Sequence, residues 1–205
     1  FRIEEPNAEG DIREVTRNGQ DKWYVRYLLQ ANHDPSLQIP AKEAWKARNI
    51  PGLTESEFNA REYLLLSLGQ ASRICSHIET SLRTSTPAGY VLDATGAYEF
   101  FTQKALKLEQ SGFGVMLPAW WTRKGTKLHL TARANVKAPE MQSASGLSLE
   151  QIVQFDWEVA LGDERLSLEE LQRLAKLKAP LVKLRGQWVQ INPEEIKAAI
   201  EFWKK

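Results

Sequence analysis

The chain has a single cysteine and few histidines, and these scarcities exclude several kinds of site. Cys75 is the only cysteine in 205 residues, so the chain can form no internal disulfide and no zinc site built on cysteines. Its histidines, His33, His77 and His129, lie far apart, and none belongs to an H-E-x-x-H motif. We therefore expect no bound metal, and the cysteine content suits the cytoplasm.

Phosphate-binding loops and long apolar runs are missing as well. The chain has no G-x-x-x-x-G-K-[ST] motif, which excludes a standard ATP site, and no G-x-G-x-x-G motif after a strand, which leaves dinucleotide binding unsupported. The longest apolar runs, such as 63–68, are far shorter than the roughly 20 residues that span a bilayer. We expect a cytoplasmic chain without a signal peptide or a transmembrane segment.

The composition is that of a folded chain without a strong charge bias. Hydrophobic residues make up 42%, enough for a substantial core, and charged residues make up 26%. The net charge is only +1, so the chain lacks the overall basic field of many nucleic-acid-binding proteins. A role in nucleic-acid binding must therefore rest on local basic patches.

The beginning of the chain and one group of turn residues suggest how it is divided. The first residue is Phe1 rather than Met, and we expect the parent protein to extend beyond this chain. Residues 1–20 are acidic and polar, and we interpret them as a loosely attached edge or an extended arm. Asn49-Ile-Pro-Gly52 marks a domain boundary. We predict an N-terminal arm and strand–helix unit at 1–50 and an α+β core domain at 51–205.

Periodicity and turn residues predict strands and helices in the first half of the chain. Pro40 is placed at a helix start, the capping box Thr54-x-x-Glu57 opens a helical region in which Gly69 is a candidate break, and Gly112 stops a later helix. The predicted elements are a strand at 23–30, a helix at 40–45, a helical region at 55–82, a helix at 94–108 and a strand at 113–117.

The second half of the chain carries clear alternation and strong helix starts. Ser167 caps one helix, and Asn192-Pro193 opens another with a cap and a proline at the first position. The predicted elements are strands at 128–133 and 153–159, a helix after 167, a hairpin of 181–184 with 187–191, and a helix after 192. Together these elements predict an α+β fold, with a mixed or antiparallel sheet and helices packed on it.

The stretch from Pro118 to Pro139 is basic and contains no acidic residue. Its cations could follow a phosphate backbone while the two tryptophans at its start stack on bases or sugars. The alternative is a solvated hairpin with lysines protecting its edge and tryptophans in the core. The candidate nucleic-acid-binding residues here are Trp120, Trp121, Arg123, Lys124, Lys127, His129, Arg133 and Lys137.

A second basic stretch joins a helix end to the predicted hairpin. Lys183 and Arg185 are the candidate DNA contacts in it, and Arg173, Lys176 and Lys178 precede them. Cations are favourable at a helix C-terminus whatever the function, so helix stabilisation alone is the alternative explanation. If the two basic stretches share one face of the fold, the hypothesis of nucleic-acid binding is strengthened.

The residues that could suggest catalysis have ordinary explanations. Asp156 and Glu158 alternate along a predicted strand, as a carboxylate pair could, but the pattern is also that of a solvated strand face. Cys75 lies beside Ile74 and Ile78 on a predicted helix and is interpreted as a small core residue rather than a nucleophile.

Several stretches of the chain, taken in order, resemble one known family. They are Trp23-Tyr-Val-Arg-Tyr-Leu-Leu-Gln-Ala31, His33-Asp-Pro-Ser-Leu37, Ile39-Pro40 with Trp45, Gly112-Phe-Gly-Val-Met-Leu-Pro-Ala-Trp-Trp121, Phe155-Asp-Trp-Glu-Val-Ala-Leu-Gly-Asp163, Leu168-Glu-Glu-Leu171 and Pro180-Leu-Val-Lys-Leu-Arg-Gly-Gln-Trp-Val189. The pattern is similar to the helicase-associated region that precedes the ATPase core in bacterial Swi/Snf-type helicases. It covers the chain from about Trp23 to the end, and the run from Phe155 to Val189 is its most specific part.

The resemblance implies a parent protein that is a superfamily 2 ATPase moving on double-stranded DNA. Its ATP and Mg²⁺ sites are then expected beyond Lys205, and no catalytic residue of the family has a counterpart in this chain. The implied role is DNA contact, regulation of the ATPase core of the same chain, or docking of partners. Direct contact predicts weak, salt-sensitive DNA binding that the double change Arg123→Glu with Lys127→Glu reduces.

A protein-docking module with no nucleic-acid role is the rival hypothesis. Seven tryptophans exceed what a core of this size needs, and aromatic side chains anchor protein interfaces. An exposed apolar patch around Trp120, Trp121 or Trp188 would favour this interpretation. An independent enzyme has no supporting constellation of residues.

Overall fold

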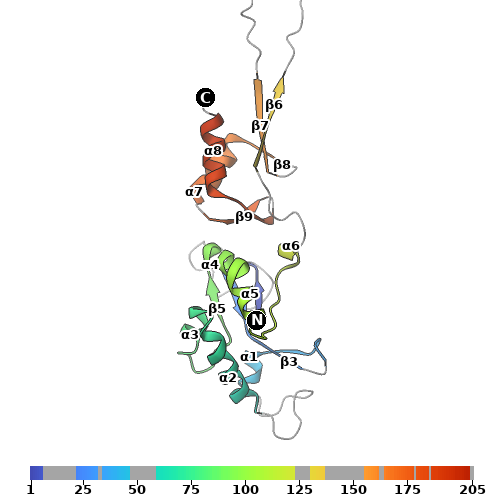
Figure 1. Ribbon diagram of the computed structural model, residues 1–205, viewed down its shortest axis with the longest axis vertical. Coiled ribbons are helices and arrows are strands. Elements are labelled where there is room, and N and C mark those ends of the chain that lie inside the picture. Colours follow the sequence, from blue (N-terminus) through green and yellow to red (C-terminus); the bar gives the residue numbers. More distant parts are fainter. Residues whose placement is uncertain are drawn as a thin grey trace, which may run out of the picture. The chain divides into compact units, whose positions relative to one another are not determined.

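The computed structural model describes residues 1–6, 22–31, 34–46, 59–122, 130–136, 155–161, 164–177, 179–184 and 186–203. They form helices and antiparallel sheets, which confirms the predicted α+β class, and the chain divides into two compact units, Phe1–Arg123 and Lys124–Lys205 (Figure 1). Across these described ranges, every helix is too short or too polar to span a membrane.

An antiparallel sheet of three strands organises the first unit. Its order is β1 (Arg2–Glu4), β2 (Trp23–Arg26) and β5 (Gly89–Leu92). Trp23 and Val25 are fully buried on one face of β2, as alternation predicts. The sheet therefore joins residues from both sides of the predicted division at 50/51, and the boundary segment itself lies outside the described residues.

The start of the chain is paired to this sheet. β1 lies antiparallel to β2, and Arg26 donates two hydrogen bonds to the Glu4 carboxylate, from Nε at 2.7 Å and from Nη2 at 2.9 Å. A bidentate pair of this kind fixes both side chains. Residues 2–4 are thus an edge strand, whereas 7–20 of the predicted arm lie outside the described residues.

The strand predicted at 23–30 is interrupted at Tyr27. Beyond it, β3 (Leu28–Gln30) forms a hairpin with β4 (Gln38–Pro40) rather than continuing the first sheet. The Tyr27 N–H donates to Ala88 O, while its carbonyl accepts from Ala41 N. The chain changes sheets here because these two hydrogen bonds lead to different neighbours.

In the described residues after the hairpin, the first helices have limits that differ from the prediction. They are α1 (Ala41–Ala44), α2 (Ala60–Ser72) and α3 (Ser76–Ser81). Gly69 does not break the helical region, since α2 continues past it to Ser72 and the extended Cys75 separates α2 from α3. Asn59 caps α2 by accepting from Arg61 N and Glu62 N, and the capping box predicted at 54–57 lies outside the described residues.

The helix predicted at 94–108 is present but contains a wider turn. It consists of α4 (Ala94–Glu99), the π-helical segment η2 (Phe100–Lys104) and α5 (Ala105–Gln110). The π turn lets the consecutive Phe100 and Phe101 both face the core, where they are 1% and 5% exposed. Gly112 ends the helix with a positive φ of 86°, as predicted.

The predicted strand at 113–117 forms only an isolated parallel bridge, between Met116 and Arg2. Met116 N donates to Phe1 O at 2.8 Å, and Ile3 N donates to Met116 O at 3.2 Å. The short α6 (Ala119–Thr122) follows. This segment is therefore held against β1 rather than buried inside a sheet.

The second unit combines a three-stranded sheet with a helix–hairpin–helix arrangement. β6 (Leu130–Val136), β7 (Phe155–Leu161) and β8 (Glu164–Leu166) are antiparallel and lie in this order. After them come α7 (Leu168–Leu177), the hairpin of β9 (Leu181–Leu184) with β10 (Gln187–Gln190), and α8 (Pro193–Trp203). The predicted strand residues 128–129 and 153–154 lie outside the described residues.

Local sequence signals of the second unit are confirmed. Ser167 and Glu170 form a reciprocal capping box, with hydrogen bonds of 2.8 Å and 3.2 Å. Gly186 turns the hairpin with φ of 87°, and Asn192 Oδ1 accepts from Glu194 N at the start of α8. The core beneath these elements contains Leu166, Leu171, Leu174, Val182, Val189, Ile191 and Ile196.

Candidate nucleic-acid interface

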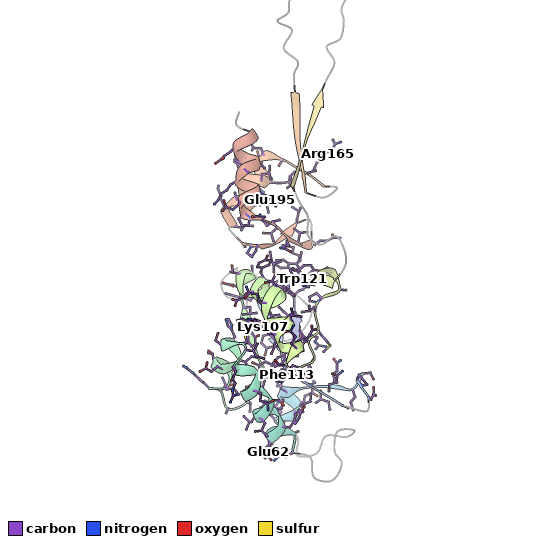
Figure 2. All side chains as sticks on the ribbon, viewed as in Figure 1. Glu62, Lys107, Phe113, Trp121, Arg165 and Glu195 are labelled. Carbon is purple, nitrogen blue, oxygen red and sulfur yellow. The ribbon has the colours of Figure 1, made fainter. Side chains whose placement is uncertain are left out.

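The two tryptophans of the first basic stretch belong to an aromatic cluster in the first unit. Trp121 stacks on Phe101 with ring centroids 4.6 Å apart and an interplanar angle of 21°, and its position can be followed in Figure 2. Trp120 packs edge-on against Phe101 at 5.7 Å and lies 6.1 Å from the buried Trp23. Both indoles are half-buried, so they stabilise the unit, and base stacking by them stays a prediction.

A hydrogen bond further fixes Trp120. Its Nε1 donates to Glu5 Oε1 at 2.6 Å, which ties α6 to the residues just after β1. A carboxylate acceptor makes such a bond short and strong. This arrangement matches the alternative in which the tryptophans serve the core.

The other candidate residues are distributed between the second unit and the undescribed segments. Arg133 lies in β6 opposite Glu158 of β7 in the strand register, and Lys183 lies in β9. Asp156, the other residue of the considered carboxylate pair, lies opposite Asn135. The candidates outside the described residues are Arg123, Lys124, Lys127, His129, Lys137 and Arg185.

Exposed cations run from the end of α7 into the hairpin. Arg173 and Lys176 are exposed and three positions apart, which makes them neighbours on the surface of α7. In β9, Leu181 and Val182 are buried while Lys183 is exposed. Because the helix and the hairpin share one core, this packing holds the three cations at the surface of the second unit.

These three cations differ from Lys197 of α8 in their ion pairing. Among the described residues, Arg173, Lys176 and Lys183 have no acidic partner within ion-pair distance. In contrast, Lys197 of α8 pairs with Glu194 at 2.8 Å. Lys176 also lies in the last turn of α7, where the helix dipole favours cations, so helix stabilisation is the alternative explanation for this residue.

Buried hydroxyl and thiol groups form a separate cluster in the first unit. Cys75 is 2% exposed, and its Sγ lies 3.5 Å from Tyr90 Oη. Tyr27 Oη lies 2.7 Å from Ser81 Oγ. Burial is the main cause that raises the pKa of both Tyr27 and Tyr90, with the adjacent Cys75 adding to the effect at Tyr90. Cys75 is therefore a core residue, as interpreted from its neighbours.

No metal centre is evident in the part of the chain that the structure describes. No group of three or more histidine, cysteine, aspartate or glutamate side chains there is arranged to hold an ion. His77 stacks on Tyr90 at 5.4 Å between ring centroids and so takes a packing position.

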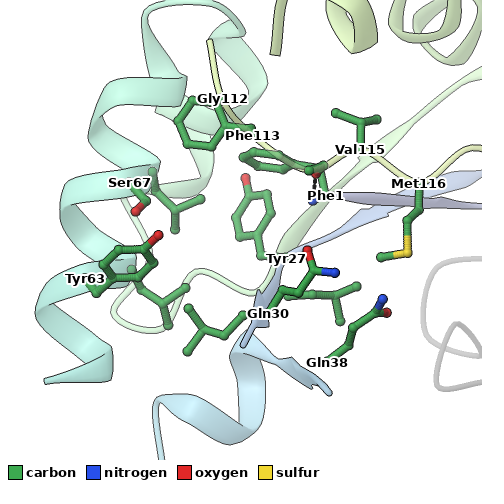
Figure 3. A pocket seen from close by; sticks show the side chains of 15 residues that line it. Phe1, Tyr27, Gln30, Gln38, Tyr63, Ser67, Gly112, Phe113, Val115 and Met116 are labelled. Carbon is green, nitrogen blue, oxygen red and sulfur yellow. Dashed lines mark hydrogen bonds between the residues drawn. The ribbon is translucent and has the colours of Figure 1, made fainter. Parts of the chain in front are cut away.

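A pocket of about 420 Å³ in the first unit was not anticipated from the sequence. Figure 3 shows side chains from α2, the β3–β4 hairpin and the segment after Gly112 around it. The Phe1 nitrogen donates to Gly114 O at 2.7 Å at this pocket. No sequence motif marks these residues, because the pocket forms from segments far apart in the chain.

Comparisons with known proteins concern both the family and a relative. Residues 85–205, more than half of the chain, match the model of a family described as "SNF2 Helicase protein". The whole chain is 23% identical over 211 residues to "Putative ATP-dependent helicase/translocase YwqA" of Bacillus subtilis (strain 168), and it spans 20% of that protein's length. No solved structure matches the chain. Since the family match covers every element from β5 to α8, including the whole second unit, the chain belongs to the SNF2 helicase protein family.

Proposed function

We propose that this chain is a non-catalytic accessory domain of a Swi/Snf-type DNA-dependent ATPase, and that the motor lies C-terminal to it in the parent protein. The family match and the 20% coverage of a relative named as a helicase/translocase support this role. ATP and Mg²⁺ then bind in the motor, and the partners of the chain are double-stranded DNA and that ATPase core. The parent is expected in the bacterial cytoplasm.

DNA contact is assigned to the exposed cations of α7 and β9. Arg173, Lys176 and Lys183 form no ion pair with an acidic side chain among the described residues, and a shared core holds the elements that carry them. Phosphate contacts release condensed counterions, so even a few such cations give measurable binding at low salt. With a net charge of +1, the chain has no general attraction to DNA that could replace them.

The test compares two triple charge reversals with the same change in net charge. One variant carries Arg173→Glu, Lys176→Glu and Lys183→Glu, and the control carries Arg61→Glu, Arg73→Glu and Lys107→Glu, which are exposed residues of the first unit. Fluorescence anisotropy with a labelled duplex at low salt should show at least about a ten-fold larger loss of affinity for the first variant. Equal losses, or no binding by the unmodified chain, would exclude this interface.

Docking through the tryptophans has no specific support among the described residues. Trp188 is 5% exposed, and Trp120 and Trp121 are packed in the aromatic cluster. Regulation of the motor belongs to the same proposal, because an accessory domain in the same chain as the ATPase core would be held close to it.

A further inference from the structure

The pocket of the first unit runs along the outer edge of strand β3. Four consecutive residues, 27–30, line it, together with Gln38 from the neighbouring strand. Successive residues of a strand point to opposite faces, so a cavity that touches all four reaches the edge of the strand as well as the face that carries Gln30 and Gln38. Figure 3 shows Tyr27 and Gln30 on this side of the pocket, opposite Tyr63 and Ser67 of α2.

The hydrogen-bond pattern leaves this edge of β3 without a strand neighbour. Ala41 N donates to Tyr27 O just before β3, and Ala31 N donates to Leu37 O just after it. By alternation, Leu29 between them is the residue of β3 that faces its partner Ile39 in β4. In an antiparallel pair, the residues on either side of such a residue direct N–H and C=O away from the partner. Leu28 and Gln30 are those residues, and their main-chain groups have no hydrogen bond within the described ranges. Pro40 opposite Leu28 fits the same pattern, because it has no N–H to give.

The side chains around the pocket are apolar or neutral. Phe1, Phe113 and Tyr63 supply aromatic surface, and Gln30 and Gln38 supply amides. Among the described residues that line the pocket there is no aspartate, glutamate, lysine, arginine or histidine. Tyr63 is 52% exposed, and Leu66 on the same flank of α2 is 62% exposed. A charged ligand would lose hydration here without gaining a counter-charge from these described residues, whereas an uncharged apolar side chain would gain contacts with them.

We propose that this edge binds an extended, uncharged peptide segment of a partner protein as an added strand on β3, with one apolar side chain entering the pocket. The unpaired N–H and C=O groups of Leu28 and Gln30 bond to the peptide backbone, and the pocket selects its side chain. The pocket lies in the first unit and the proposed DNA-binding cations lie in the second. Peptide binding can thus fail while DNA binding persists, and the reverse also holds.

The first experiment uses NMR spectra of the ¹⁵N-labelled 205-residue chain and the capped peptide acetyl-Thr-Leu-Thr-Val-Thr-Leu-Thr-amide. Amide shifts are expected at 28–30, at 63–68 and at 112–116. Two versions of the peptide are compared, one methylated on the backbone nitrogens of its threonines and one on the backbone nitrogens of its leucines and valine. Their affinities should differ by at least about ten-fold, because only one of these two sets of N–H groups faces β3. Equal affinities, or no shifts at 28–30 at millimolar peptide, would overturn the proposal.

Two pairs of variants test the site itself. Leu28→Pro removes the outward N–H without removing a bond to β4, whereas Leu28→Ala keeps it, so only the proline variant should lose binding. Tyr63→Ala should weaken binding, and Leu65→Ala, which removes a side chain of the same 52% exposure that does not line the pocket, should not. This second pair decides the matter if the proline variant does not fold. Shifts at these amides that appear with rising protein concentration and no peptide would show a second copy as the occupant and overturn the proposal.

Discussion

Trp120 and Glu5 are joined by a hydrogen bond of 2.6 Å between the indole Nε1 and the carboxylate Oε1, although 115 positions separate them in the sequence. The bond fixes a residue that the sequence offered as a base-stacking platform. Glu5→Ala leaves the half-buried N–H without its acceptor and should lower the free energy of unfolding by about 1–3 kcal/mol. Urea unfolding followed by tryptophan fluorescence measures this change.

The control for this prediction is Glu109→Ala, at an exposed position of α5. It should change stability by no more than about 0.5 kcal/mol. If both substitutions have the same small effect, Trp120 is not held by Glu5 in solution and is freer to stack on a ligand.

The hydroxyl pair of Tyr27 and Ser81 predicts an asymmetric response to mutation. Ser81 Oγ donates to Ile78 O at 2.7 Å, so the hydrogen bond of 2.7 Å between Tyr27 Oη and Ser81 Oγ must use the tyrosine proton. Ser81→Ala strands the buried Tyr27 hydroxyl and should cost about 1–3 kcal/mol, more than Tyr27→Phe, which leaves Ser81 its bond to Ile78. Chemical unfolding of both variants checks the order, and the reverse order would refute the assigned donor.

Alkaline pH should destabilise the first unit through Tyr27 and Tyr90. Burial raises the pKa of each phenol above the ordinary 10.0, so the unfolded chain releases these protons first. The stability they contribute is complete below pH 10 and decreases as the pH rises toward the raised values. The unfolding midpoint should fall above pH 10, and phenolate absorbance should show both groups still protonated in the folded chain there. Full tyrosine ionisation without unfolding would contradict this.

Two glycines should respond in opposite directions to the same substitution. Gly89 has φ of 157°, and a Cβ there would collide with the carbonyl oxygen of Val25 in the paired strand. Gly69 lies inside α2 with open space at its Cβ position. Gly89→Ala should therefore destabilise the unit, while Gly69→Ala should stabilise it by about 0.5–1 kcal/mol. Thermal unfolding of both variants provides the comparison, and stabilisation by Gly89→Ala would show that β5 is not paired as described.

Features set by neighbouring residues could be predicted from the sequence. The β9–β10 hairpin follows from Gly186 between two apolar runs, and the start of α8 follows from Asn192-Pro193. The break at Tyr27 could not be predicted, because the hydrogen bonds that cause it go to Ala88 and Ala41. Contacts between distant segments decide such features.

The same limit applies to the candidate site. Lys183 could be identified as a candidate from the sequence, because the alternation of apolar and polar residues in the predicted hairpin indicates that this cation is exposed. Trp120 packs against Trp23 and bonds to Glu5, and both partners are about a hundred positions away in the sequence. The sequence alone therefore leaves two interpretations of Trp120, a core residue or a platform for base stacking. The pocket beside β3 has no sequence signal at all, because an unpaired strand edge is a property of the assembled sheet.

The most direct test of the proposed DNA contact is the salt dependence of duplex binding by the 205-residue chain and by its triple variant Arg173→Gln, Lys176→Gln and Lys183→Gln. Each phosphate contact contributes about −0.9 to the slope of log K against log salt, so the variant should have a slope shallower by about 2–3. Identical slopes for the two proteins would show that these cations do not contact DNA and would contradict the account.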